Sequence, residues 1–197
     1  YQFGQLPIKN YTTSIFPDME KLETFEAPYI RNQFEIKRYP CWSCQMTHCH
    51  LYKITKGPFA DRIVEEPEYE GVAAWSSQIG QTDVIKAILL SDKVDRLGMD
   101  CNESSWVIGL LMECYEKGII TKKDTDGLEM TWGNVEAVTA MLDKMANRQE
   151  VGDLLAEGAK QVAHHIGGEA LELAVFTKKG NSPRSHDHRG NWYELFD

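Results

Sequence analysis

The distribution of proline divides this chain of 197 residues into two parts of different character. Six of the seven prolines lie before residue 75, and each of them disfavours a helix running through its position. Long helices are therefore excluded from this part of the chain. We predict that residues 1–75 form an irregular segment with only short elements, packed on the helices that follow.

From Gly80 onward, apolar residues recur at the spacing of amphipathic helices, between polar cap residues and terminal glycines. This pattern predicts helices over residues 82–98, 102–118, 134–148 and 152–168, and a short strand over residues 171–180. We expect a mainly α-helical protein with an irregular, cysteine-rich N-terminal part. The expected regions are residues 1–75, a helical region over 76–180 and an outgoing loop over 181–197, all within one structural domain.

Composition limits the classes of partner. Apolar residues make up 42% of the chain and charged residues 26%, as in globular proteins, and no apolar run approaches the roughly 18 residues of a membrane span. The net charge of −9 repels phosphate backbones, so we expect no nucleic-acid partner. Five cysteines, an odd number, favour a reducing compartment over a disulfide scaffold, and we expect a cytoplasmic protein.

The stretch CWSCQMTHCH, residues 41–50, concentrates soft metal ligands. Cys41 and Cys44 form a C-x-x-C pair, and Cys49 follows, a spacing that recurs in zinc and iron–sulfur sites because thiolates on a tight turn converge on one centre. His48 and His50 can complete a zinc set, so zinc stays open although iron–sulfur is favoured. The alternative is a surface loop with incidental thiols.

Four segments, in order along the chain, carry a resemblance to a known family: GPFADRIVEEPEYEG, DRLGMD, CYEKGIITKKDTDGLEMTWGN and GDLLAEG. Together they resemble the aldehyde ferredoxin oxidoreductase family of tungsten-pterin enzymes. Within it, GMDCNESSW and the cysteine stretch are most similar to the tungsten subunit of class II benzoyl-CoA reductases. The resemblance implies the helical middle domain of a larger multidomain enzyme, whose other parts supply a second pterin motif and a fourth cluster ligand.

In that family a C-x-x-C-x-x-x-C stretch supplies three ligands to a 4Fe-4S cluster. The resemblance therefore implies that Cys41, Cys44 and Cys49 bind iron. This chain departs from the family spacing by one residue, and His48 stands where the third cysteine is expected. We favour Cys49 because thiolates suit low-potential iron, with His48 as the alternative ligand.

The element DRLGMD resembles the family's D-x-x-G-L-D motif, which binds a tungsten bis-pterin cofactor of the molybdopterin type. It implies that Asp95, Gly98 and Asp100 bind the cofactor, and that Cys101 is a thiolate ligand of tungsten. The alternative for DRLGMD is a common helix-capping sequence without a cofactor. The alternative for Cys101 is a small apolar residue packed beneath a helix. The choice between tungsten and molybdenum stays open.

The resemblance further implies that Glu70 transfers protons near the metal, and His48 and His50 are candidate catalytic residues beside the cluster. His186 and His188 are candidates for lining a substrate channel. The implied reaction is reductive dearomatisation of benzoyl-CoA to a cyclic diene carboxyl-CoA thioester in anaerobic aromatic degradation. The alternative is oxidation of aldehydes to carboxylates, and electrons would pass to or from ferredoxin or an electron-transfer subunit. A further alternative is a zinc- or cluster-stabilised helical electron-relay or interaction module without catalysis.

Overall fold

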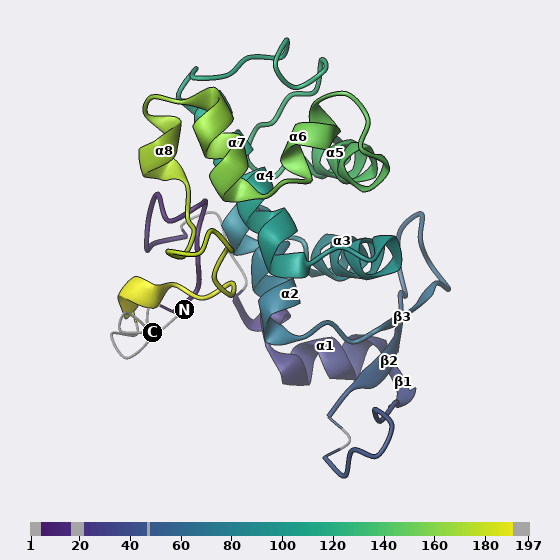
Figure 1. Ribbon diagram of the computed structural model, residues 1–197. Helices are drawn as coiled ribbons and strands as arrows, with labels where there is room; N and C mark the ends of the chain where they lie inside the picture. Colours follow the sequence, from purple (N-terminus) through teal and green to yellow (C-terminus); the bar gives the residue numbers. More distant parts are fainter. Residues whose placement is uncertain (1–4, 17–21, 47, 191–197) are drawn as a thin grey trace.

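A computed structural model describes residues 5–16, 22–46 and 48–190 of the chain. The described residues are mainly α-helical, as predicted (Figure 1). The helices are α1 (Ala27–Phe34), α2 (Tyr69–Ala74), α3 (Val84–Leu97), α4 (Cys101–Glu116), α5 (Val135–Asn147), α6 (Val151–Leu155), α7 (Ala159–Ile166) and α8 (Ala170–Leu173). Short 3-10 turns are η1 (Leu22–Phe25), η2 (Ser77–Ile79) and η3 (His188–Gly190), and the strands are β1 (Glu35–Arg38), β2 (His50–Lys53) and β3 (Ile63–Glu65).

Helix α4 is the centre of the main core. Every residue from Ser104 to Cys114 is buried, so this helix is covered on all sides, as an apolar run without a polar face requires. Helices α2, α3, α7 and α8 contact it directly, and α5 completes the core from beyond α3 (Figure 1). The helical region predicted from the apolar spacing is thus the body of the molecule.

The predicted helices over 82–98, 102–118 and 134–148 correspond to α3, α4 and α5. Asp83 caps α3 by accepting hydrogen bonds from the Ile85 and Lys86 amides, and Asn134 caps α5 by accepting one from the Ala137 amide. Helix α4 begins one residue earlier than predicted, because Asp100 is its cap. Asp100 thereby belongs to both the turn and the helix.

The predicted helix over 152–168 is wrong as a single element, since the chain breaks it at Gly158 into α6 and α7. Gly158 has φ +89°, and a Cβ there would lie 2.6 Å from a carboxylate oxygen of Glu103. The same carboxylate accepts hydrogen bonds from the Ala159 amide, at 2.8 Å, and the Ser182 amide, at 2.7 Å. A partner 56 residues away therefore starts α7, and local periodicity cannot reveal it.

The predicted strand over 171–180 is also wrong: α8 occupies its first residues, and residues 174–180 form neither helix nor strand. The loop that follows returns along the N-terminal segment. The Asp187 amide donates to the Gln5 carbonyl at 2.6 Å, and the Trp106 indole of α4 donates to the Pro183 carbonyl at 2.7 Å. Residues 191–197 of the predicted outgoing loop lie outside the described residues, and the predicted boundaries at 75 and 180 stay predictions.

The N-terminal part of the chain contains a three-stranded antiparallel sheet of order β1-β2-β3, which the sequence did not predict. Arg38 pairs with His50 and Leu51 with Glu65. Tyr52, Ile54 and Val64 pack against α1 and α3 in a second small core. The strands are too short, at four residues or fewer, for an alternating pattern to stand out among the prolines.

No helix in the described part of the chain is both long and apolar enough to cross a membrane.

Candidate metal and cofactor site

The three clustered cysteines lie on the connection between β1 and β2, at one end of the molecule (Figure 1). Strand pairing closes the base of this loop, where the Tyr39 amide donates to the Cys49 carbonyl at 2.9 Å. A turn joins the C-x-x-C pair, since the Cys44 amide donates to the Cys41 carbonyl at 3.1 Å. All three cysteines are free thiols, so the loop offers soft ligands on one short stretch.

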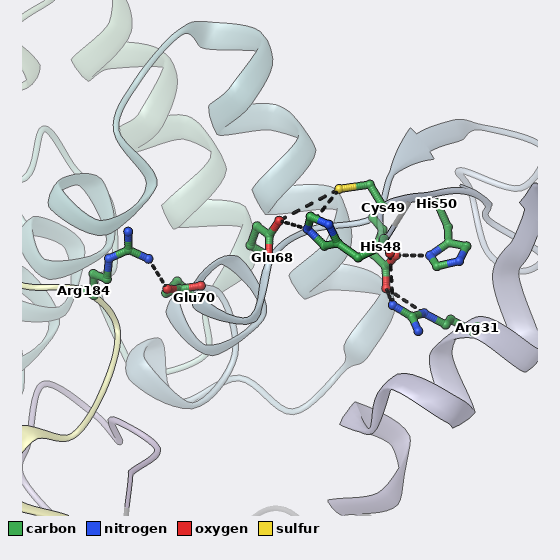
Figure 2. Close-up of polar contacts among 8 residues, drawn as sticks. Arg31, His48, Cys49, His50, Glu68, Glu70 and Arg184 are labelled. Carbon is green, nitrogen blue, oxygen red and sulfur yellow. Dashed lines mark hydrogen bonds and ion pairs between the residues drawn. The ribbon is translucent and has the colours of Figure 1, made fainter. Parts of the chain in front are cut away.

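Cys49 faces two further metal-ligating groups, His48 and Glu68 (Figure 2). The His48 Nε2 atom lies 2.8 Å from a Glu68 carboxylate oxygen and 3.4 Å from the Cys49 sulfur. One donor atom from each of the three lies within 4.8 Å of the others. Burial, followed by contact with the Cys41 thiol, raises the pKa of Cys49 to about 11, so a bound cation has to displace its proton.

His50 occupies a different environment from His48, although only one residue separates them. His50 is the first residue of β2 and is buried, with its ring directed into the protein (Figure 2), whereas His48 lies before the strand and is exposed. Its Nδ1 atom is hydrogen-bonded to Glu66, and its Nε2 atom lies 3.7 Å from the Glu35 carboxylate. Of the two histidines, the structure brings only His48 to the thiol of Cys49.

A second group of predicted residues lies at the turn from α3 to α4. Gly98 ends α3 with φ +70°, which a residue with a side chain adopts only with strain. A Cβ placed on Gly98 would meet no protein atom within 4 Å, so the surface over this turn is open. Asp100 accepts a hydrogen bond from the Glu103 amide at 2.7 Å, and burial raises the pKa of Asp95, with the neighbouring charge of Asp92 adding to it.

Cys101 is the first residue of α4 and follows this turn directly. Its sulfur accepts a hydrogen bond from the Trp75 indole, with 3.2 Å between the nitrogen and sulfur atoms. Burial raises the pKa of Cys101 to about 12, although the Trp75 bond favours the thiolate, and the carboxylates of Asp95, Asp100 and Glu70 raise it further. Such a thiol ionises only when a cation compensates it, as a metal ligand requires.

Glu70 lies in the first turn of α2 and is held by the loop that follows α8. Arg184 donates to a Glu70 carboxylate oxygen at 2.5 Å (Figure 2). The His186 Nε2 atom lies 3.6 Å from the same oxygen. Partial burial alone would raise the pKa of Glu70, but its backbone hydrogen bond and the Arg184 and His186 side chains outweigh this and lower the pKa. Glu70 is therefore ionised at neutral pH.

Helix α2 links the two groups. Glu68 precedes its first residue and faces Cys49, whereas Trp75 follows its last residue and contacts Cys101. A cavity of about 620 Å³ lies on the Cys49 side of α2, between α1 and the start of β2. Sequence reasoning did not single out Glu66, Trp75 or Arg184, because their partners lie 16 to 114 residues away.

The sequence profile of the family described as "Aldehyde ferredoxin oxidoreductase, domains 2 & 3" matches residues 1–194. The tungsten-containing aldehyde ferredoxin oxidoreductase of Pyrococcus furiosus is 31% identical over 190 residues, covering 95% of this chain and 29% of that protein. The aliphatic sulfonate oxidoreductase, WOR-like subunit, of the same organism is 29% identical over 177 residues, covering 87% of this chain and 28% of that subunit. The chain thus spans less than a third of the length of these relatives.

Among solved structures, the active site complex BamBC of benzoyl coenzyme A reductase with 1,5-dienoyl-CoA superposes with a TM-score of 0.76. The sequence identity is 22%, and the match covers 94% of this chain and 27% of that chain. The two proteins share a fold over nearly the whole length of this chain.

Proposed function

The chain belongs to the aldehyde ferredoxin oxidoreductase family, and on this premise we propose that it is part of a tungsten-dependent oxidoreductase. The observation that carries the proposal is the position of Cys101. Cys101 is the first residue of α4 and follows the Asp95–Asp100 turn directly. The carboxylate of Glu70 is close enough to influence the ionisation of its thiol. The residues fit a pterin-bound metal because a soft thiol lies beside an open glycine turn and two carboxylates.

In this proposal Cys101 holds the tungsten, while Asp95 and Asp100 accept hydrogen bonds from the pterin next to Gly98. Cys41, Cys44 and Cys49 would supply three ligands of a 4Fe-4S cluster, with His48 as the alternative to Cys49. When bound, the cluster supplies single electrons and the pterin-bound tungsten supplies the redox chemistry of the substrate. Glu70, whose pKa is lowered by its backbone hydrogen bond and by Arg184, accepts or relays the proton of the reaction at its carboxylate.

The reaction that we propose is reduction of benzoyl-CoA to a cyclic diene carboxyl-CoA thioester. A protein thiolate beside the pterin turn supports it, and a protein of the same fold has been solved with 1,5-dienoyl-CoA. The electron donor would be ferredoxin or an electron-transfer subunit, and the rest of the polypeptide would complete the site. We propose a cytoplasmic location, where low-potential clusters stay reduced.

Oxidation of an aldehyde to a carboxylate is the second candidate. Two observations favour it. The relatives at 31% identity are named as aldehyde ferredoxin oxidoreductases, and the ionised carboxylate of Glu70 is suited to accept a proton that aldehyde oxidation releases. A non-catalytic electron-relay module is the third candidate, and it requires metal at the cysteine loop with none at Cys101.

Elemental analysis of the anaerobically purified full-length protein tests the proposal. We expect iron and tungsten in the wild type, and loss of tungsten with retention of iron in Cys101→Ser. Cys114→Ala is the matched control, because Cys114 is a buried thiol of the α4 core away from the turn, and it should keep both metals. Zinc alone, or tungsten retained in Cys101→Ser, would contradict the proposal.

Activity assays then separate the two reactions. Benzoyl-CoA with a reduced low-potential donor should be converted by a benzoyl-CoA reductase and left unchanged by an aldehyde oxidoreductase. An aldehyde with an oxidised acceptor should give the opposite result.

A further inference from the structure

Glu66, directly after β3, is the centre of a polar network that the proposed reaction does not use. Its side chain is only 13% exposed, and it accepts hydrogen bonds from Arg31 of α1, at 3.0 Å, and from His50 of β2. Tyr52, two residues further along β2, also bonds to it. Three donors from two elements therefore converge on one carboxylate.

The network lies at the base of the cysteine loop. A second Arg31 nitrogen donates to the backbone carbonyl of His48 at 3.2 Å, and the Glu66 amide donates to the His50 carbonyl at 2.8 Å. Cys49 stands between these two anchored residues, and its own carbonyl accepts from the Tyr39 amide. The backbone on both sides of Cys49 is thus fixed by hydrogen bonds.

Side chains in the described middle of the loop are exposed: Trp42, between the first two cysteines, is 97% exposed, and Met46 is 82% exposed. The contacts described above tie Cys49 to α1 and to the residue after β3, in addition to the apolar packing of Tyr52 and Val64 that joins the sheet to α1. Groups that lie behind metal ligands orient them in this way in other metal sites.

We propose that Arg31, Glu66 and His50 are positioning residues that fix Cys49 for binding of the iron–sulfur cluster. This inference rests on the cluster of the proposed function. It assigns His50, whose two ring nitrogens both face carboxylates, to orientation of the loop. His48, whose ring faces the Cys49 thiol, is left as the histidine able to contact the cluster.

The test compares Arg31→Met, Arg31→Lys and Glu66→Gln in the full-length, anaerobically purified protein. The readouts are iron and tungsten content, the electron paramagnetic resonance spectrum of the reduced cluster, and the rate at which a chelator removes iron. We expect Arg31→Met and Glu66→Gln to lose iron about 10-fold faster and to change the spectrum, with tungsten retained. Arg31→Lys keeps a cation for Glu66 and should recover part of the effect.

Arg62→Met is the matched control. Arg62 is as exposed as Arg31, at 37%, and pairs with a buried carboxylate, Asp92 of α3, in the same part of the fold. Its guanidinium is directed to α3 and not to the cysteine loop, so its loss should leave iron and spectrum unchanged. Equal iron loss in Arg62→Met, or unchanged iron in Arg31→Met and Glu66→Gln, would overturn the positioning role. If the wild-type protein contains no iron, both the proposed cluster and the positioning role are overturned. If the wild type contains iron and the variants keep it equally well, only the positioning role is overturned.

Discussion

Glu70 and Arg184 form a contact between residues 114 positions apart, and it helps to lower the pKa of the proposed proton-transfer group. Arg184 remains 75% exposed while the carboxylate is 18% exposed, so the pair has one side towards solvent. His186 adds to the same electrostatic environment, and its ring packs on Tyr69 with 5.0 Å between centroids. The loop after α8 therefore contributes to the lowered pKa of Glu70 on α2.

Replacing Arg184 should shift the pH dependence of activity. In Arg184→Met the pKa of Glu70 rises, because its main cationic partner is gone, while the partial burial remains. Activity that requires ionised Glu70 should then fall at a higher pH than in the wild type, so the acid limb of the pH–rate profile moves upward. Arg184→Lys retains a cation and should move the limb less. An acid limb at the same pH in Arg184→Met would show that Glu70 ionisation does not control the reaction.

At the scale of elements, the α3–α4 turn joins two helices and exposes the predicted pterin motif. Gly98 and Gly118 make a comparable pair, since both follow a helix with φ near +70°, and at both an added Cβ would have no protein atom within 4 Å. They differ in location, because only Gly98 lies beside Asp95 and Cys101. This pair separates backbone strain from cofactor contact.

We expect Gly98→Ala and Gly118→Ala each to lower the free energy of unfolding by about 1 kcal/mol, the cost of left-handed backbone for a residue with a Cβ. Denaturant unfolding measures this cost. Tungsten content should fall in Gly98→Ala alone, because the added methyl group would occupy the space over the turn. Equal tungsten content in the two variants would contradict a cofactor at Gly98.

The sequence predicted α3, α4 and α5 well because their signals are local: a polar residue at the start and an apolar stripe, with a terminal glycine after α3 and α4. It failed where the start of a helix or the packing of a strand depends on residues far away in the sequence. Glu103 of α4 accepts the hydrogen bond that begins α7, and the sheet packs on α1 and α3. The same holds for the candidate site, where the thiols and the Asp95–Asp100 turn were recognised, but Glu66, Trp75 and Arg184 were not, because only the fold brings them to their partners.

At the scale of the whole molecule, Glu113 of α4 connects distant parts of the chain. It accepts a hydrogen bond from Asn10 at 2.7 Å, and Asn10 in turn donates to the Leu173 carbonyl of α8. Glu113 is 5% exposed, and burial raises its pKa, partly offset by the Asn10 bond. The side-chain carbonyl oxygen of Asn10 is buried without a hydrogen-bond partner among the described residues.

Glu113→Gln should stabilise the protein at neutral pH. A carboxyl with a raised folded pKa contributes stability below its unfolded pKa and loses it as the pH rises through the folded pKa. Glutamine removes this loss and offers an amide donor to the unpaired Asn10 oxygen. Denaturant unfolding should show a gain at pH 7 that shrinks towards pH 4, and none for the exposed neighbour Glu116→Gln. A less stable Glu113→Gln at pH 7 would contradict the assignment.

The bonds from Glu103 to the amides of Ala159 and Ser182 have a consequence for the order of events during synthesis. Cys101 and Glu103 leave the ribosome before the loop residues that contact this region. Ser182 follows its partner Glu103 by 79 positions, and Arg184 follows its partner Glu70 by 114 positions. The contacts that the loop after α8 makes with the first turns of α4 and α2 can therefore form only once that loop has been synthesised.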